Sequence, residues 1–153
     1  MKKRVLSLVV SLLATSLFAA SETINGITWN YNVSGGKATI ISCPESASGA
    51  VTIIDIPATI NGYPVTTIGD YAFSGHSSLT SVTIPKGMTS FGGWAFYNCT
   101  SLTAITIPEG VTFIGDSAFA LCYSLTSVTI PKGVTSIGWN AFGHCYGLTS
   151  VTI

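Results

Sequence analysis

The stretch LTSVTIPKGVTSIGWNAFGHCYG, residues 125–147, repeats a pattern that occurs twice upstream, as LTAITIPEGVTFIGDSAFALCYS at residues 102–124 and LTSVTIPKGMTSFGGWAFYNCTS at residues 79–101. A fixed period of this length is the signature of a solenoid, in which each unit buries its apolar face by stacking on its neighbours. A unit of 23 residues is too short for a pair of helices, but it fits a strand with a tight return. The sequence therefore predicts a repeat solenoid. Its recurring columns are Leu79, Leu102, Leu125 and Leu148; Ile84, Ile107, Ile130 and Ile153; Phe73, Phe96, Phe119 and Phe142; and Gly69, Gly92, Gly115 and Gly138.

Each repeat divides into two extended segments and a compact turn. In LTSVTIP the first, fourth and sixth residues are apolar and the others before the proline are polar, which is typical of a short strand with one face toward the core. Pro131 and Gly133 then turn the chain, because proline cannot continue a ladder and glycine tolerates unusual backbone angles. VTSIG forms a second extended segment with Val134 and Ile137 facing inward. The apolar residues of AFGHC have helical spacing, so we predict one helical turn per repeat.

The residues ahead of the repeats predict a cap. GITWNYNV and KATIISC flank residues 34–36, Ser-Gly-Gly, and the first of these segments alternates strictly between apolar and polar residues, which is typical of a β-hairpin. We predict that residues 22–50 form an N-terminal β-hairpin cap over the open edge of the solenoid, which occupies residues 51–153. Its first repeat, residues 51–78, is five residues longer than the later ones. We expect the extra residues, around Asn61, to bulge out as a loop.

The N-terminus has the pattern of a secretory signal peptide. The basic residues 2–4 precede the apolar run 5–18, and three small residues follow. We expect residues 1–21 to be removed, because a cut one residue earlier would put the bulky Phe18 at the third position back from the cut.

Composition limits the partners of the mature chain. Charged residues make up only 8% of the sequence, and the part that remains carries three lysines against six carboxylates, a net charge of about −3. This balance argues against nucleic-acid binding. The N-terminal apolar run is too short to span a membrane comfortably, and no later segment is long enough. We therefore expect a secreted or cell-surface protein that does not insert into a membrane after signal removal.

The pattern LTSVTIPKGVTSIG followed by AFxxC resembles the BspA-like subclass of leucine-rich repeats, found in surface and secreted proteins of anaerobic bacteria and some protist parasites. The lead-in ATINGYPVTTIGDYAF is similar to the way such arrays begin, and the resemblance covers residues 27–153. It implies stacked leucine-rich repeats with short parallel strands. Members of the family are implicated in adhesion to host proteins and other cells, so an adhesin-like role is implied as well. The last repeat is incomplete at Ile153, and we interpret the sequence as a fragment, with closure of this edge by a partner as the alternative.

One column of the repeat holds three cysteines, Cys99, Cys122 and Cys145. His76 holds the same position one repeat before Cys99. Zinc would require closely spaced ligand pairs such as C-x-x-C, which the sequence lacks. Repeats ~4.8 Å apart are close enough for a disulfide, but in-register side chains point the same way and suit disulfide geometry poorly. We interpret the column as buried thiols that act as small apolar side chains, with a disulfide and a metal site as alternatives. Cys43 belongs to the hairpin.

Catalytic residues are scarce in this sequence. It contains no G-x-S-x-G, H-E-x-x-H or G-x-x-x-x-G-K motif. Asp70 and Asp116 share a column two repeats apart, ~9.6 Å by the strand spacing, but a glycosidase pair would also need a substrate cleft, which a convex turn does not provide. We interpret these carboxylates as part of a solvated surface, and we predict no enzymatic activity and no bound cofactor or metal.

Binding has more support from the sequence. The outward strand positions should form a flat, weakly charged, hydroxyl-rich stripe of Ser81, Thr83, Thr106, Ser127 and Thr129, continued by Ser150 and Thr152 and interrupted by Ala104. Aromatic residues vary between repeats where the core does not, at Trp94, Tyr97, Tyr123, Trp139 and Tyr146. Tryptophan and tyrosine are favoured in binding hot spots. We predict that both sets contribute to ligand binding; the alternative for several aromatics is that they only cover the compact-turn side of the core.

These features favour an exported, non-enzymatic protein that binds proteins or cell-surface ligands. A structural surface spacer without a specific ligand is the alternative. Regular S-x-T arrays on a flat solenoid also suit ice binding, which the interruption at Ala104 disfavours.

One column carries alternating charges. Lys86, Glu109 and Lys132 follow the proline of three successive repeats. Repeats ~4.8 Å apart bring such side chains within reach of each other, so we predict a ladder of exposed ion pairs worth ~0.2–1 kcal/mol each. The pairs would also hold register, since a slip by one repeat would place lysine against lysine.

Overall fold

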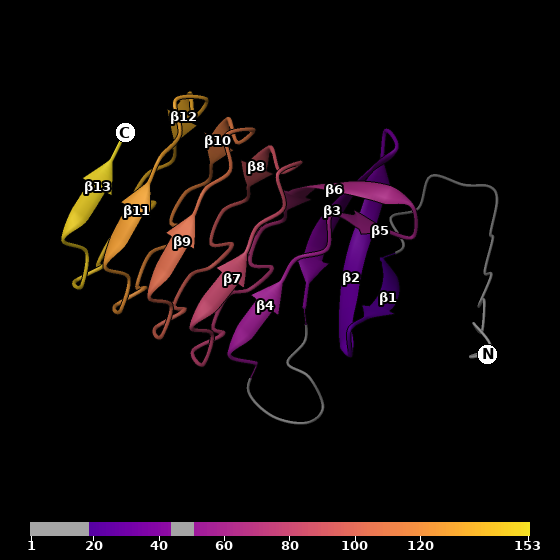
Figure 1. The fold of residues 1–153 in the computed structure, drawn as a ribbon, viewed down its shortest axis with the longest axis horizontal. Helices are drawn as coiled ribbons and strands as arrows, with labels where there is room; N and C mark the ends of the chain where they lie inside the picture. The colour runs from indigo at the N-terminus through magenta and orange to yellow at the C-terminus, as the bar shows by residue number, and fades with distance from the viewer. Residues whose placement is uncertain (1–18, 44–50) are drawn as a thin grey trace.

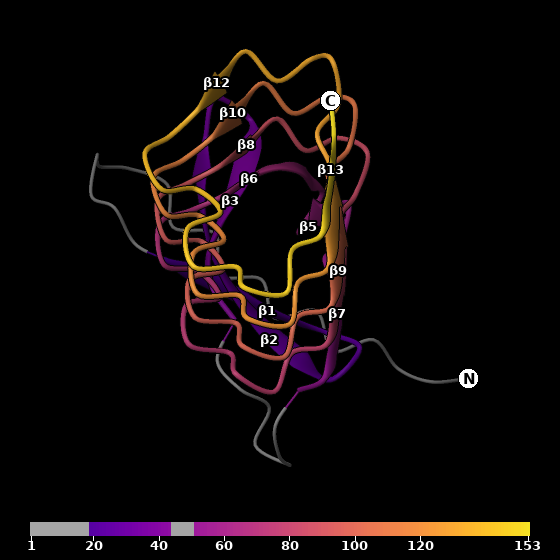
Figure 2. The same cartoon turned by 90° about the vertical axis from the view of Figure 1, so that its left-hand side faces the viewer.

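The computed structural model describes residues 19–43 and 51–153, which form a stack of coils joined to an N-terminal sheet (Figure 1). Along the stack, successive coils lie over one another with similar outlines (Figure 2). None of the described residues forms a helix that could cross a membrane. The strands are β1 (Ala20–Ile24), β2 (Ile27–Ser34), β3 (Lys37–Ser42), β4 (Ile53–Asp55), β5 (Thr59–Ile60), β6 (Tyr63–Ile68), β7 (Ser81–Thr83), β8 (Ser90–Phe91), β9 (Ala104–Thr106), β10 (Phe113–Ile114), β11 (Ser127–Thr129), β12 (Ser136–Ile137) and β13 (Ser150–Thr152).

Two parallel ladders run along the stack, as the two extended segments of each repeat predict. On one side β4 pairs with β7, and β9, β11 and β13 pair in that order. On the other side β6, β8, β10 and β12 pair in order. Paired residues in consecutive 23-residue coils hold the same repeat position, as Val128 does between Ile105 and Val151. The short parallel strands and the solenoid architecture are therefore confirmed.

The core runs the length of the stack as one continuous apolar cluster. Its centre is the phenylalanine column, in which the rings of Phe73, Phe96, Phe119 and Phe142 stack nearly parallel with centroids 4.9, 5.3 and 5.3 Å apart. Such offset stacks add to the free energy of burying the rings. One inward prediction needs correction at the end of the stack. Ile137 is 46% exposed because no described coil lies beyond β12 to cover it, whereas Ile114 at the same position one coil earlier is fully buried.

The glycine column exists because consecutive coils approach closely at this turn. A Cβ atom on Gly115 would lie 2.5 Å from the carbonyl carbon of Gly92, well inside van der Waals contact. A Cβ atom on Gly138 would likewise lie 2.6 Å from the carbonyl carbon of Gly115. No side chain fits between these backbones without separating the coils.

The predicted hairpin is present as β2 and β3, which pair antiparallel across the Ser-Gly-Gly turn. Strand β1, which the sequence reasoning did not predict, pairs with the outer edge of β2. β3 pairs in parallel with β6, so the hairpin continues the sheet of the solenoid and covers its first coil. The predicted signal peptide falls mostly on residues 1–18, outside the described ranges, as do residues 44–50 of the predicted cap; Ala20 and Ser21 are the first residues of β1.

The five-residue insertion forms a second hairpin and not an irregular loop. β5 and β6 pair antiparallel across Asn61 and Gly62, whose φ angles of 48° and 81° are both left-handed. Two successive left-handed residues are typical of the tight turns that match the twist of a hairpin. The backbone N–H of Asn61 donates a 2.6 Å hydrogen bond to the carboxylate of Glu22 in β1. The insertion therefore joins the cap to the solenoid.

The predicted helical turn is wrong for the described coils. Two positions in each compact turn are left-handed, and they interrupt the right-handed conformation that a helix needs. The central amide between them bonds to the next coil, as Phe73 N–H does to Ala95 C=O and Phe119 N–H to Ala141 C=O, both at 2.8 Å. The apolar residues of the compact turn have helical spacing because this turn, although not helical, also places them on the side that faces the core. The left-handed residues are Tyr71, Gly75, Trp94, Asn98, Ser117, Leu121, Asn140 and His144.

Candidate functional site

The hydroxyl stripe lies on one face of the molecule, as predicted. In β7, β9 and β11 the central residue is buried and its neighbours are exposed, because successive side chains of a strand point to opposite faces. Parallel pairing in register then aligns the exposed residues in two columns, with Ser127 beside Ala104 and Thr129 beside Thr106. The stripe consists of Ser81, Thr83, Thr106, Ser127, Thr129, Ser150 and Thr152, all of which are exposed.

A groove follows the downstream edge of this stripe. It has a volume of about 670 Å³ and crosses three coils. We call it the strand groove, and its lining residues are Val82, Thr83, Ile84, Lys86, Thr106, Ile107, Pro108, Glu109, Gly110, Thr129 and Pro131. It brings three predicted binding residues, the threonines, together with Lys86 and Glu109, two charges that were predicted to pair with each other. Ser81 and Ser127 lie on the same strands but do not line it.

The predicted ion-pair ladder is not formed. No pair of oppositely charged atoms within 4.0 Å joins Lys86, Glu109 and Lys132 in the described part of the chain. The physical reason is the exposure of all three residues on a turn. In that setting an ion pair gains little over hydration and loses side-chain entropy. Lys86 and Glu109 are therefore exposed charges at the edge of the strand groove.

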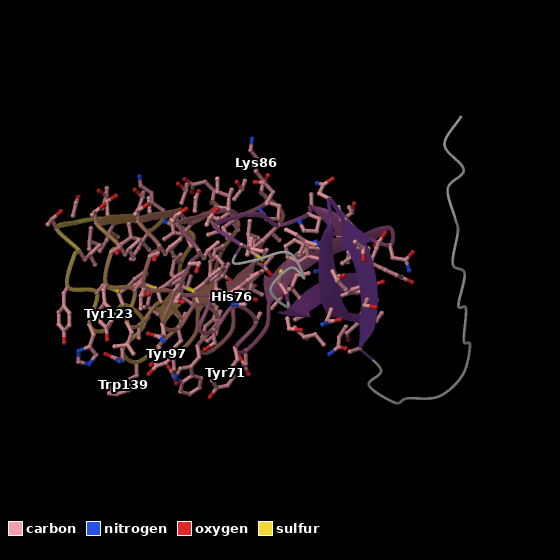
Figure 3. The ribbon with its side chains drawn as sticks, turned by 90° about the horizontal axis from the view of Figure 1, so that it is seen from below. Tyr71, His76, Lys86, Tyr97, Tyr123 and Trp139 are labelled. Atoms are coloured by element: carbon pink, nitrogen blue, oxygen red, sulfur yellow. The ribbon has the colours of Figure 1, made fainter. Side chains whose placement is uncertain are left out.

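The predicted aromatic residues lie on the other side of the molecule. Figure 3 shows Tyr71, Tyr97, Tyr123 and Trp139 on the side opposite Lys86. Trp94 stacks on Tyr71 with ring centroids 5.1 Å apart, and Tyr146 stacks on Tyr123 at 5.7 Å. We call Tyr71, Trp94, Tyr97, Tyr123, Trp139 and Tyr146 the aromatic face. The structure thus divides the ten predicted site residues between two faces that cannot contact one small ligand.

Neither Tyr71 of the aromatic face nor the contact that His144 makes with this face was predicted from the sequence. Tyr71 lies in the same column as Trp94, one repeat earlier, so the 23-residue period could have identified it. His144 donates or accepts a 2.9 Å hydrogen bond between its Nδ1 and the hydroxyl of Tyr146, and its ring packs edge-on against that tyrosine. A two-residue separation at a turn gives no sequence signal for such a contact.

The carboxylates of Asp70 and Asp116 have structural partners. Asp70 Oδ1 accepts a 2.7 Å hydrogen bond from the backbone N–H of Gly93, and Asp116 Oδ1 accepts one of the same length from that of Trp139. Each carboxylate therefore binds the equivalent turn of the next coil. Their contribution is to coil stacking, which agrees with the structural interpretation of this column.

The cysteine column is buried, and its thiols bond to the preceding coil. Cys99, Cys122 and Cys145 donate to the carbonyl oxygens of the phenylalanine column at 3.2, 3.3 and 3.1 Å. Burial raises the pKa of Cys99 to about 12 and also raises the pKa values of the other two thiols. All three side chains are buried, as the interpretation of this column as buried thiols requires. His76 differs: its Nε2 lies 2.8 Å from the carbonyl oxygen of Cys43 and so links the first full turn to the cap.

A family model described as a BspA type leucine rich repeat region matches residues 46–153 in six copies. Among solved structures, a leucine-rich repeat protein from Bacteroides capillosus is 35% identical with a TM-score of 0.75; 86% of this chain and 96% of that chain are covered. A comparison with curated proteins found no match.

Two longer solved proteins are also similar. A leucine-rich repeat protein from Bacteroides ovatus is 31% identical with a TM-score of 0.65, and the likeness covers 86% of this chain and 41% of that one. A leucine rich cell surface protein from Faecalibacterium prausnitzii is 33% identical with a TM-score of 0.61, and 87% and 42% of the two chains are covered. The family model spans most of the chain and the stacked coils have the expected period. The chain belongs to the BspA-type leucine-rich repeat family.

Proposed function

We propose that the chain is an exported, non-enzymatic leucine-rich repeat protein that binds proteins or cell-surface ligands in the manner of an adhesin. The observation that carries this proposal is the aromatic face. Trp139 and Tyr146 in the last full coil are each 78% exposed, and Tyr71 and Tyr123 within the stack are 57% and 42% exposed. Exposed tryptophan and tyrosine side chains gain free energy when a partner excludes water from them.

Several features support the location and the class of partner. The N-terminal sequence has the pattern of a signal peptide, and one similar solved protein is described as a leucine rich cell surface protein. The predicted mature chain has a net charge of about −3, which disfavours nucleic acid as a partner. The described carboxylates at the repeat turns bond to backbone amides, an arrangement that serves folding more than catalysis. We expect no membrane insertion once the signal segment is removed.

The test is a binding assay with matched variants. The purified chain is immobilised and exposed to intact bacterial and animal cells and to extracellular-matrix proteins. We expect wild-type binding and a loss of about tenfold or more in W139A and Y146A. The thermal melt should be unchanged in W139A, whose side chain is exposed, and slightly lower in Y146A, which also loses its stacking on Tyr123. Val33→Ala, at an exposed apolar residue of the cap that belongs to neither predicted binding set, is the control.

A structural spacer is the alternative function. It requires no ligand, and the continuous core of the coils suits a stiff extension. A wild-type chain that binds none of the cells or proteins, while its melt shows it to be folded, would support the spacer and contradict the adhesin proposal.

A further inference from the structure

The strand groove offers charges that nothing in the described chain neutralises. Lys86 and Glu109 line it one coil apart, and no ion pair joins them. A positive and a negative group therefore stand side by side at the rim of one groove. A partner with the opposite arrangement of charges would gain from both.

The floor of the groove is apolar and carries hydroxyls at regular intervals. Ile84, Ile107, Pro108 and Pro131 provide aliphatic surface, and a threonine hydroxyl stands at each of the three coils. Two strand spacings give the groove a length of roughly 10 Å, which is about three residues of extended polypeptide. No aromatic ring lines it, so it lacks the stacking surface on which a sugar ring would pack.

We propose that the strand groove binds an extended segment of a partner protein, with an acidic side chain against Lys86, a basic side chain two residues away against Glu109, and an adjoining apolar side chain on the prolines. In an extended chain, residues two apart point to the same face, so both charges can face the groove together. The threonine hydroxyls donate to or accept from the backbone of the segment. This proposal rests on the proposed function, because it assigns a protein partner to a chain inferred to bind proteins or cell-surface ligands.

The experiment selects ligands without assuming their sequence. A displayed library of random heptapeptides is selected on the immobilised wild-type chain, and the enriched peptides are synthesised and titrated. We expect enrichment of an acid and a base two residues apart beside an apolar residue. Binding of these peptides should fall about tenfold in K86E and in E109K, because each reversal replaces an attraction by a repulsion.

Two matched variants make the result specific. Lys132→Glu reverses a charge of the same column that does not line the groove, and it should change binding less than twofold. In the double variant K86E/E109K the charges of the groove are exchanged. A peptide whose own acid and base are exchanged should then regain the binding that the original peptide has for wild type. Circular dichroism and thermal melts confirm that each variant is folded.

Three outcomes would overturn the proposal. They are the enrichment of no peptide with paired charges, equal binding of selected peptides to wild type, K86E and E109K, and glycan binding that depends on Lys86 and Glu109 while no peptide is enriched. The assay with cells separates this from the proposed function. Loss of adhesion in W139A with no effect of K86E would leave the adhesin proposal standing and remove the groove from it.

Discussion

Phe119 illustrates how single side chains hold neighbouring coils together. Its ring is fully buried and stacks on Phe96 at 5.3 Å and on Phe142 at 5.3 Å, so it contacts a coil on each side. It also packs edge-on against Phe91 of β8 at 5.5 Å. Loss of this ring therefore affects three coils, which is the physical basis of cooperativity in a one-dimensional stack.

We expect Phe119→Ala to lower the free energy of unfolding by ~3–5 kcal/mol, because it opens a cavity in the middle of the core. Chemical denaturation measures the loss. Phe113→Ala, in the same coil but with an exposed ring, is the control and should cost less than ~1 kcal/mol. Equal losses in the two variants would contradict the register of the coils.

Burial of the cysteine column predicts that its thiols are unreactive in the folded protein. Because the thiolate is the reactive form and the pKa of Cys99 is raised from 9.0 to about 12, its thiolate fraction near pH 8 is about a thousandfold below that of an unperturbed thiol. In a Cys43→Ser background, alkylation should label none of the three column thiols in the native state and three after unfolding. A count of one after unfolding without reductant would indicate a disulfide.

The same pKa shift predicts loss of stability in alkali. The unfolded thiol releases its proton near pH 9 and the folded thiol only near pH 12, so the unfolded state binds fewer protons between these values. The contribution of Cys99 to the free energy of unfolding should therefore be fully present below about pH 8 and fall as the pH rises from 9 toward 12. Denaturant melts at pH 7, 9 and 10.5 measure this, and Cys99→Ala should show a shallower decline.

At the scale of the elements, threonine ladders reinforce the strands. The hydroxyls of Thr80, Thr103, Thr126 and Thr149 each donate to the backbone carbonyl of the corresponding residue one coil earlier, at 2.8–3.2 Å. A second column does the same at Thr89, Thr112 and Thr135. These columns precede the strands, so the hydroxyls extend the pairing beyond the short ladders. The recurrence of threonine at these positions was visible in the sequence, but its partner was not.

Thr103→Val should therefore destabilise the fold by ~0.5–1.5 kcal/mol, because valine keeps the shape and removes the hydrogen bond. Thr106 is the matched control: it lies in the same coil, and its hydroxyl has no hydrogen-bond partner in the described chain. Thr106→Val should change the free energy of unfolding by less than ~0.5 kcal/mol. Denaturant melts of the two variants, measured side by side, show whether the threonine hydrogen bonds stabilise the fold.

At the scale of the whole molecule, the cap and the solenoid share one core. Trp29 of β2 packs edge-on against Phe73 at 6.3 Å, and Gly69 N–H donates to Ile40 C=O at 2.7 Å. Strand β3 extends the same sheet as β6. The apolar cluster contains residues of both parts without a break. We therefore expect residues 19–43 to unfold together with the first coils.

This predicts coincident unfolding transitions. In the variant W94F/W139F, Trp29 is the remaining tryptophan and its fluorescence reports the cap, while circular dichroism reports the whole chain. Both signals should change at the same denaturant concentration, because the two parts form one cooperative unit. Ile40→Ala, a buried cap residue, should shift both midpoints together. A cap transition at lower denaturant, with the array intact, would show two independent units.

The sequence by itself determined the period, the stacked coils, the two strands in each coil, the β2–β3 hairpin and the family. Apart from the hairpin, these features follow from the 23-residue period, because residues 23 apart occupy equivalent positions when similar units stack. It also identified Phe119 and the cysteine column as core, because recurring apolar residues need burial.

Only the tertiary structure decided how the surface is arranged. The compact turn is not helical, because left-handed residues interrupt it and its central amide bonds to the next coil. Lys86 and Glu109 do not pair, because hydration competes on an exposed turn, and the strand groove instead joins them to the threonines. The aromatic residues lie on the opposite face. Periodicity fixes which residues share a column, but the direction in which a column faces depends on turn geometry, and that is set by contacts between coils.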